Sequence, residues 1–137
     1  MSKKDILSAF IAEVWNKQRK DLVKKFVAES YRIHLDPGDP WEGQTLNHET
    51  FTQRLDYSFH SFPDIHFELT SAIEEAHHVA VTWVLTGTNL GKINAYPPTH
   101  KKIKVKGLTI YYFEGNLIAG HSQIFDRTTV SAQLGFV

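Results

Sequence analysis

Four runs of strand-forming residues fill nearly all of the chain after Pro63, and they restrict the fold more than any other feature. These runs are residues 64–75, 78–88, 102–114 and 117–127. Alternation is clearest in the third run, where lysines interleave with Ile103 and Val105. The connections are short except for residues 89–101, and Glu114-Gly115-Asn116 is typical of a hairpin turn. We therefore expect neighbouring strands to be antiparallel.

The first half of the chain has helical periodicity instead. Ser2 and Asp5 have the spacing of a capping box, and apolar residues then recur every three or four positions up to Trp15. After this helix the pattern predicts a short helix over residues 22–27, a short strand over residues 30–35, and a third helix that begins after Asn47 and stops at Pro63. Helices followed by a strand meander predict one α+β domain over residues 1–137, with the helices on one face of the sheet.

Composition excludes several classes of function. Fifteen basic residues balance fifteen acidic ones, which argues against binding to nucleic acid or to an anionic membrane. The chain has no cysteine, so disulfides, thiolate catalysis and zinc–cysteine sites are excluded. No signal-peptide pattern and no run of about 18 apolar residues occurs, so we expect a cytoplasmic protein.

Metal and nucleotide motifs are also missing from the sequence. Eight histidines are present, but no two of them share a helix face with a carboxylate, so no metal is predicted. Neither a Gly-x-Gly-x-x-Gly sequence nor a Walker loop occurs, so nucleotide cofactors lack a binding loop. We expect a site that works without a cofactor.

The third strand-like run predicts self-association. Its lysine-bearing face continues as Leu108, Ile110 and Tyr112, while the other face carries Tyr111 and Phe113. The strand is therefore apolar on both faces at one end, and the helices cover only one face of the sheet. An uncovered apolar patch favours a partner protein. We expect a homodimer through the open sheet face.

The last strand-like run holds the main candidate for chemistry. Period-two counting places Gly120, Ser122 and Asp126 on one face, where the two small residues leave a hollow beside the acid. Alternatively, Asp126 lies past the end of the strand and pairs with a neighbour or a helix terminus. His121 and Gln123 fall on the opposite face, where they would meet a dimer partner. A bulge that shifts the register by one residue would place them in the pocket instead.

Three further residues are candidates in other strands. His34 lies in the short strand, either facing a pocket or half-buried with a bond to the backbone. Trp83 lies in the middle of a strand, where it forms an aromatic wall for a planar ligand or part of the core. Tyr111, with Thr109 on the same strand face, offers a hydroxyl group to a substrate oxygen or simply packs.

Several short stretches, in a fixed order, resemble a known family. They are Phe62-Pro63-Asp64, the strand sequence at residues 79–83, Gly-Thr-Asn-Leu-Gly at 87–91, Pro-Pro-Thr at 97–99, the stretch 115–126, and Gln-Leu-Gly at 133–135. Over nearly its whole length the chain resembles the SnoaL-like polyketide cyclases of the nuclear transport factor 2-like superfamily. The resemblance implies a cone-shaped α+β barrel, in which a curved, mixed or antiparallel sheet wraps around N-terminal helices.

The same resemblance implies a function and a site. It places an acid/base Asp late in the last strand, which matches Asp126, and a polar pocket position at His34. Ser122 stands where the family usually has an aromatic residue, which implies a wider cavity. The implied activity is a cofactor-independent cyclase or isomerase that acts on a small apolar or aromatic, polyketide-like carbonyl compound. In it, apolar walls raise the pKa of Asp126, while His34 and Gln123 orient the carbonyl.

Two alternatives stay open at this point. The first is a non-catalytic ligand-binding dimer of the same fold. The second is a relative of the hydratases, dehydratases or epoxide hydrolases, which would need another polar group beside Asp126. Arg54 and Asp56, in the third predicted helix, are the nearest candidates in the sequence for that group.

Overall fold

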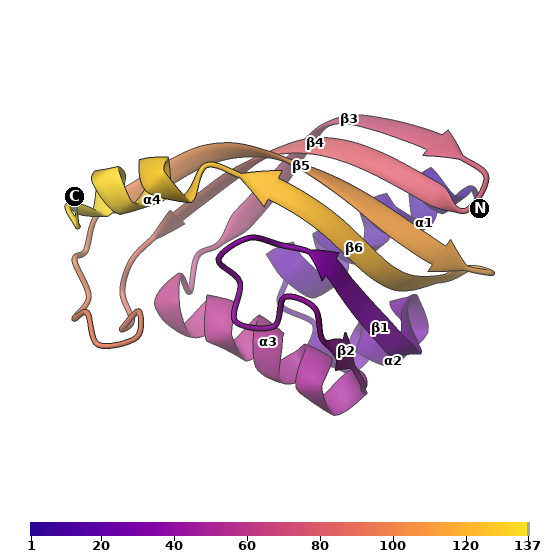
Figure 1. Ribbon diagram of the computed structural model, residues 1–137, viewed down its shortest axis with the longest axis horizontal. Helices are drawn as coiled ribbons and strands as arrows, with labels where there is room; N and C mark the ends of the chain where they lie inside the picture. Colours follow the sequence, from indigo (N-terminus) through magenta and orange to yellow (C-terminus); the bar gives the residue numbers. More distant parts are fainter. Residues whose placement is uncertain (137) are drawn as a thin grey trace.

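A curved six-stranded sheet carries helices on its concave face in the computed structural model, which describes residues 1–136 (Figure 1). The strands are β1 (Val27–Leu35), β2 (Thr45–Leu46), β3 (His66–Glu75), β4 (His78–Thr88), β5 (Lys102–Glu114) and β6 (Leu117–Phe125). Their order in the sheet is β2-β1-β6-β5-β4-β3. Only β1 and β6 pair in parallel, because the chain returns to the first strand after the meander. The predicted α+β cone is confirmed.

The helices supply the other side of the core. They are α1 (Lys3–Phe10), which continues into a π-helical segment η1 (Ile11–Asn16), then the short η2 (Lys20–Leu22) and α2 (Val23–Phe26), and finally α3 (His48–Ser61) and α4 (Arg127–Leu134). The predicted capping box is present, with the Asp5 amide donating to the Ser2 hydroxyl. Phe51 and Leu55 of α3 are buried and form an apolar stripe along the helix. None of the helices within residues 1–136 is long and apolar enough to cross a membrane.

Two predicted boundaries are wrong. Val27 was expected in the second helix, but it begins β1, because its backbone is extended and its side chain is buried against the sheet. Arg127 was expected at the end of the last strand, but it begins α4. The extended Asp126 accepts a hydrogen bond from the Thr129 amide and so caps that helix.

A bulge in β6 decides which side chains face the interior. Tyr112 of β5 pairs with Gly120, whereas Phe113 pairs with Ile118, so Ala119 is the extra residue. Gly120 lies close to β1, and a Cβ atom there would lie 2.4 Å from the Arg32 carbonyl oxygen. Period-two counting therefore fails in this strand, because the bulge reverses the faces after Ala119.

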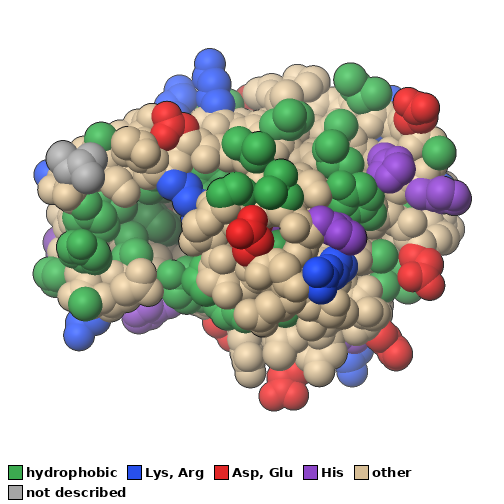
Figure 2. Space-filling view, in the orientation of Figure 1, with side chains coloured by type: hydrophobic (Ala, Val, Ile, Leu, Met, Phe, Trp, Pro, Cys, Tyr) green, Lys and Arg blue, Asp and Glu red, His purple; other side chains and the backbone are tan. Residues whose placement is uncertain are grey.

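The outer face of the sheet carries an apolar patch on β5 and β6 (Figure 2). Leu108 and Ile124 are 48% and 59% exposed and lie opposite one another in the ladder, and Ile110 pairs with Ser122. The helices cover only the other face, apart from α4 at one end (Figure 1). We propose that a second copy of the chain covers this patch.

Replacing Ile110 with lysine should weaken the dimer, because association would bury an unpaired charge. Sedimentation at micromolar concentration should show a dimer for the wild type and a mass shifted toward the 15.7 kDa monomer for the variant. Leu90→Lys is the matched control, since Leu90 is also exposed but lies beyond the end of β4. A wild-type protein that sediments as a monomer would contradict the proposal.

Candidate active site

A cavity of about 360 Å³ lies between the concave face of the sheet and the helices. This volume is within the range of about 300 to 1,000 Å³ that is usual for small-molecule sites. Figure 2 shows hydrophobic side chains around a hollow beneath α4, and four residues of α4 line the cavity. The apolar lining includes Phe10, Trp15, Phe62, Phe67, Trp83, Leu85, Ile103 and Phe125.

The polar lining is concentrated toward β1, β6 and the loop that follows β1. On this side it includes Tyr31, Asp39, Arg54, Tyr111, His121 and Gln123, and the polar residues Ser58, Ser61, Asn94, Arg127 and Ser131 also line the cavity. The apolar residues of β3 and β4 lie at the other end of the sheet order. The cavity thus presents polar groups on one side and aromatic walls on the other.

His121 is held between two partners. The residue is 2% exposed, its Nε2 lies 2.8 Å from Asp36 Oδ2, and its Nδ1 lies 2.5 Å from the Tyr31 hydroxyl. Asp36 directly follows β1, whereas His121 lies in the middle of β6. Because β1 and β6 pair in parallel, these distant segments of the chain are adjacent. We call His121 and Asp36 the His121–Asp36 pair.

Asp36 is the centre of a larger network. Its carboxylate is fully buried and accepts hydrogen bonds from His121, from Gln123 (3.1 Å), from Arg54 (3.1 Å) and from Arg127 (2.9 Å). Burial alone would raise the pKa of Asp36. The hydrogen bond from His121 and the charges of Arg54 and Arg127 outweigh burial and hold that pKa below its usual value. Asp36 is therefore ionised at neutral pH.

The ionised carboxylate fixes the tautomer of His121. An ionised Asp36 can only accept, so Nε2 carries the proton and Nδ1 is the acceptor. Burial lowers the pKa of His121 more than Asp36 raises it, so the ring is neutral. Burial also raises the pKa of Tyr31 well above its usual value, so its phenol stays protonated and donates to Nδ1. The arrangement is that of a hydroxyl, an imidazole and a carboxylate in series.

A second chain of hydrogen bonds reaches Asp36 from β4. The Trp83 indole donates to the Thr109 hydroxyl, and that hydroxyl donates to Gln123 Oε1, both at 2.8 Å. Gln123 Nε2 then donates to Asp36. This chain holds the Gln123 amide in one orientation.

The structure separates the predicted site residues into two groups. Trp83, Tyr111, His121 and Gln123 line the cavity. The bulge alternative for His121 and Gln123 is therefore the correct one, and their expected position at a dimer partner is wrong.

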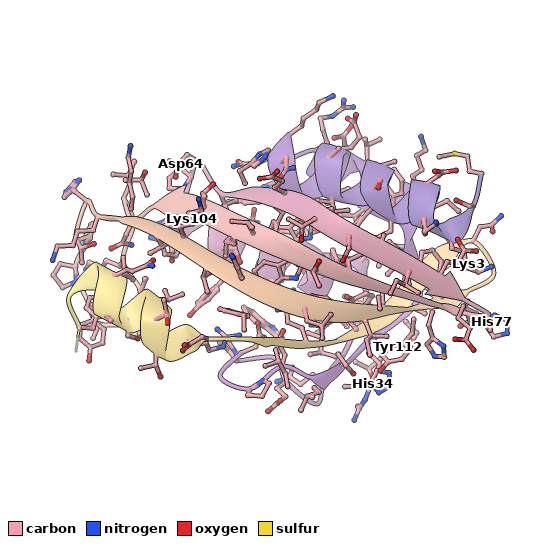
Figure 3. The ribbon with its side chains drawn as sticks, turned by 90° about the horizontal axis from the view of Figure 1, so that it is seen from above. Lys3, His34, Asp64, His77, Lys104 and Tyr112 are labelled. Carbon is pink, nitrogen blue, oxygen red and sulfur yellow. The ribbon has the colours of Figure 1, made fainter. Side chains whose placement is uncertain are left out.

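The remaining candidates lie elsewhere. His34 is exposed and packs against Tyr112 on the outer face (Figure 3). Ser122 also faces outward, where its hydroxyl bonds to the Tyr112 hydroxyl at 2.8 Å. Both were expected in the pocket, and the faces of β1 and β6 place them outside it.

Asp126 lies on the surface and does not line the cavity. Its carboxylate accepts from the Thr129 hydroxyl at 2.7 Å and from the Thr129 amide at 3.0 Å. These bonds lower the pKa of Asp126, whereas the sequence-based expectation was a raised pKa in an apolar pocket. That expectation is wrong because the strand ends before Asp126 and a helix begins there.

Sequence reasoning missed two members of the network, Tyr31 and Asp36, and it placed Arg54 beside the wrong acid. One signal for Asp36 was available, because it is a carboxylate that directly follows the predicted strand over residues 30–35. Arg54 follows Phe51 by three residues and precedes Leu55, so it belongs to the buried stripe of α3. Residues 1–136 hold no group of three His, Asp or Glu side chains placed to bind a metal ion.

Fold and cavity together define a class: small proteins in which a curved sheet closes over helices around a cavity with polar and aromatic walls. A sequence model of the SnoaL-like polyketide cyclases matches residues 5–134. The chain belongs to the SnoaL-like polyketide cyclase family. No curated protein sequence matches it significantly.

Solved structures show the same fold. A proposed polyketide cyclase from Acidithiobacillus ferrooxidans is 38% identical, with 99% of each chain covered and a TM-score of 0.91. IdmH, a proposed polyketide cyclase from Streptomyces antibioticus, is 23% identical, with 98% of this chain and 99% of that chain covered and a TM-score of 0.83. A proposed SnoaL-like polyketide cyclase from Jannaschia sp. CCS1 is 17% identical, with 96% of this chain and 90% of that chain covered and a TM-score of 0.84.

Proposed function

We propose that the protein is a cofactor-independent acid–base enzyme of the cyclase or isomerase type, acting on a small conjugated carbonyl compound. The observation that carries this proposal is the neutral, buried imidazole of His121, held between an ionised Asp36 and the Tyr31 phenol in the wall of an apolar cavity. The membership of the chain in a polyketide cyclase family supports the same class of reaction.

The arrangement suits proton transfer next to a carbonyl group. A proton leaves the carbon beside the substrate carbonyl for the Tyr31 oxygen, while the phenol proton moves to His121 Nδ1. The electron pair of the broken C–H bond becomes an enolate. Asp36 stabilises the imidazolium that forms, as the carboxylate does in other hydroxyl–imidazole–carboxylate arrangements.

The return of that proton to the substrate completes either an isomerisation or an aldol cyclisation. In an isomerisation, His121 and Tyr31 deliver it to a different carbon of the enolate. In an aldol cyclisation, the enolate carbon first forms a bond to a second carbonyl carbon, and the proton goes to the alkoxide oxygen to give a hydroxyl group. The aromatic walls hold a planar substrate in one orientation, so that the reacting atoms are already positioned before the reaction begins.

Deuterium exchange of 2-tetralone in D₂O, followed by NMR, tests the first step. The wild-type protein should accelerate exchange of the protons next to the carbonyl by about 100-fold or more over buffer. Asp126→Asn should exchange at the wild-type rate, because Asp126 lies outside the cavity. Binding of 2-tetralone without any exchange would contradict the enzyme and favour the ligand-binding alternative.

A further inference from the structure

Arg54 has one donor group that the protein leaves unused. Its Nε donates to Asp39 Oδ2 at 3.2 Å, and its Nη2 donates to Asp39 Oδ2 at 2.9 Å and to Asp36 Oδ2 at 3.1 Å. Nη1 makes no hydrogen bond within residues 1–136. Two carboxylates therefore hold the guanidinium rigidly while its third nitrogen stays available.

The side-chain amide of Gln123 also has an unused donor, because its neighbours fix the orientation of that amide. The Trp83 indole can only donate, so the Thr109 hydroxyl must accept from it and give its single proton to Gln123 Oε1. The amide nitrogen consequently faces Asp36 and uses one of its two hydrogens there. The second hydrogen has no acceptor in the described part of the chain.

Tyr111 supplies a third unused group. Its hydroxyl has no hydrogen-bond partner within residues 1–136, and burial raises its pKa, so the phenol keeps its proton. Every fully buried polar side-chain atom in this range does have a partner. The unpaired groups of Arg54 and Tyr111 must therefore reach open space, and the cavity is the space that both residues line.

Apart from the Tyr31 oxygen, which takes up the substrate proton in the proposed relay, the acceptors of this polar group are already engaged. His121 Nδ1 accepts from Tyr31, Gln123 Oε1 accepts from Thr109, and Asp39 accepts from Arg54. This side of the cavity therefore offers a ligand donors in excess of acceptors. A ligand group that only accepts hydrogen bonds matches it, whereas one that donates leaves protein donors unpaired at a cost.

We propose that Arg54, Gln123 and Tyr111 bind the oxygen atom of the ligand, and that they favour the anionic enolate oxygen of a planar conjugated ketone over the neutral carbonyl. This inference rests on the proposed function and names its substrate class. Donors that are fixed before the reaction stabilise developing charge without reorganisation, and Asp36 and Asp39 already fix the guanidinium. Hydrogen bonds to an ionised oxygen are also roughly twice as strong as those between neutral groups.

Binding of 2-hydroxy-1,4-naphthoquinone, which is an enolate-type anion at neutral pH, tests the proposal against its uncharged 2-methoxy ether. Trp15 and Trp83 line the cavity, so quenching of tryptophan fluorescence reports both ligands. The wild-type protein should bind the anion at least about tenfold more tightly than the ether. Equal affinities, or tighter binding of the ether, would overturn the proposal.

Two variants test whether Arg54 and Gln123 cause the preference for the anion. Arg54→Lys keeps the positive charge but loses the planar fork, and Gln123→Met removes the amide without changing the charge. Each should reduce the affinity for the anion several-fold more than the affinity for the ether, because the hydrogen bonds to the charged oxygen are the stronger ones. An equal loss of affinity for both ligands would show a structural role and overturn the assignment.

Thermal unfolding confirms that each variant is folded, and Tyr111→Phe replaces Arg54→Lys if that protein is unstable. The assay measures binding and not proton exchange. A failure to exchange deuterium into 2-tetralone therefore refutes the proposed function separately, and equal affinities for the two naphthoquinones refute only the oxygen site.

Discussion

Replacing His121 with asparagine should reduce the exchange rate of 2-tetralone by roughly 100-fold or more, because asparagine keeps a polar side chain in place but cannot take up a proton. NMR in D₂O measures the rate under the conditions used for the wild type. Tyr31→Phe should also lower it, since the phenol lies between the imidazole and the substrate in the proposed relay.

The pH dependence of the exchange rate of 2-tetralone is a second test of this prediction. Burial lowers the pKa of His121, so the base should stay neutral and active as the pH falls to about 6.5, the usual value for histidine. The rate should fall only at lower pH, where the imidazole becomes protonated. A His121→Asn variant that keeps the wild-type rate and profile would show that another group carries the proton.

Replacing Asp36 with alanine should lower the free energy of unfolding at pH 7 by about 3 to 5 kcal/mol, the range found when one partner of a buried ion pair is removed. Asp36 is fully buried and accepts from four side chains, so its loss leaves the His121 Nε2 proton without a partner and removes a counter-charge from Arg54. Urea denaturation measures the difference.

Asp56→Ala is the matched control, because the Asp56 pair with Lys20 is exposed and should contribute only about 0 to 1 kcal/mol. The folded-state pKa of Asp36 is lowered, so its contribution is complete above about pH 3.9, the usual value for aspartate, and is lost as the pH falls through the folded pKa. The difference between wild type and Asp36→Ala should therefore shrink in acid. Equal losses in Asp36→Ala and Asp56→Ala at pH 7 would contradict the role given to the network.

The sequence by itself determined the architecture. Helical spacing up to Trp15 and alternation around Ile103 are local patterns, and each is read from neighbours along the chain. They predicted the order of the elements apart from β2 and α4, and with it that the helices cover one face of the sheet. Trp83 and Tyr111 line the cavity, which is one of the two alternatives left open for each from the sequence, and β4 and β5 pair without a bulge between residues 78–88 and 102–112.

Only the tertiary structure decided the site. Asp36 and His121 are 85 residues apart, and they meet because the first strand and the last pair in parallel. The same pairing brings β1 against Gly120, and the bulge at Ala119 turns His121 inward and Ser122 outward. Counting alternate residues along one strand does not reveal how a neighbouring strand pairs with it. The sequence therefore placed Asp126 in the pocket, whereas the contact between the two strands places His121 there.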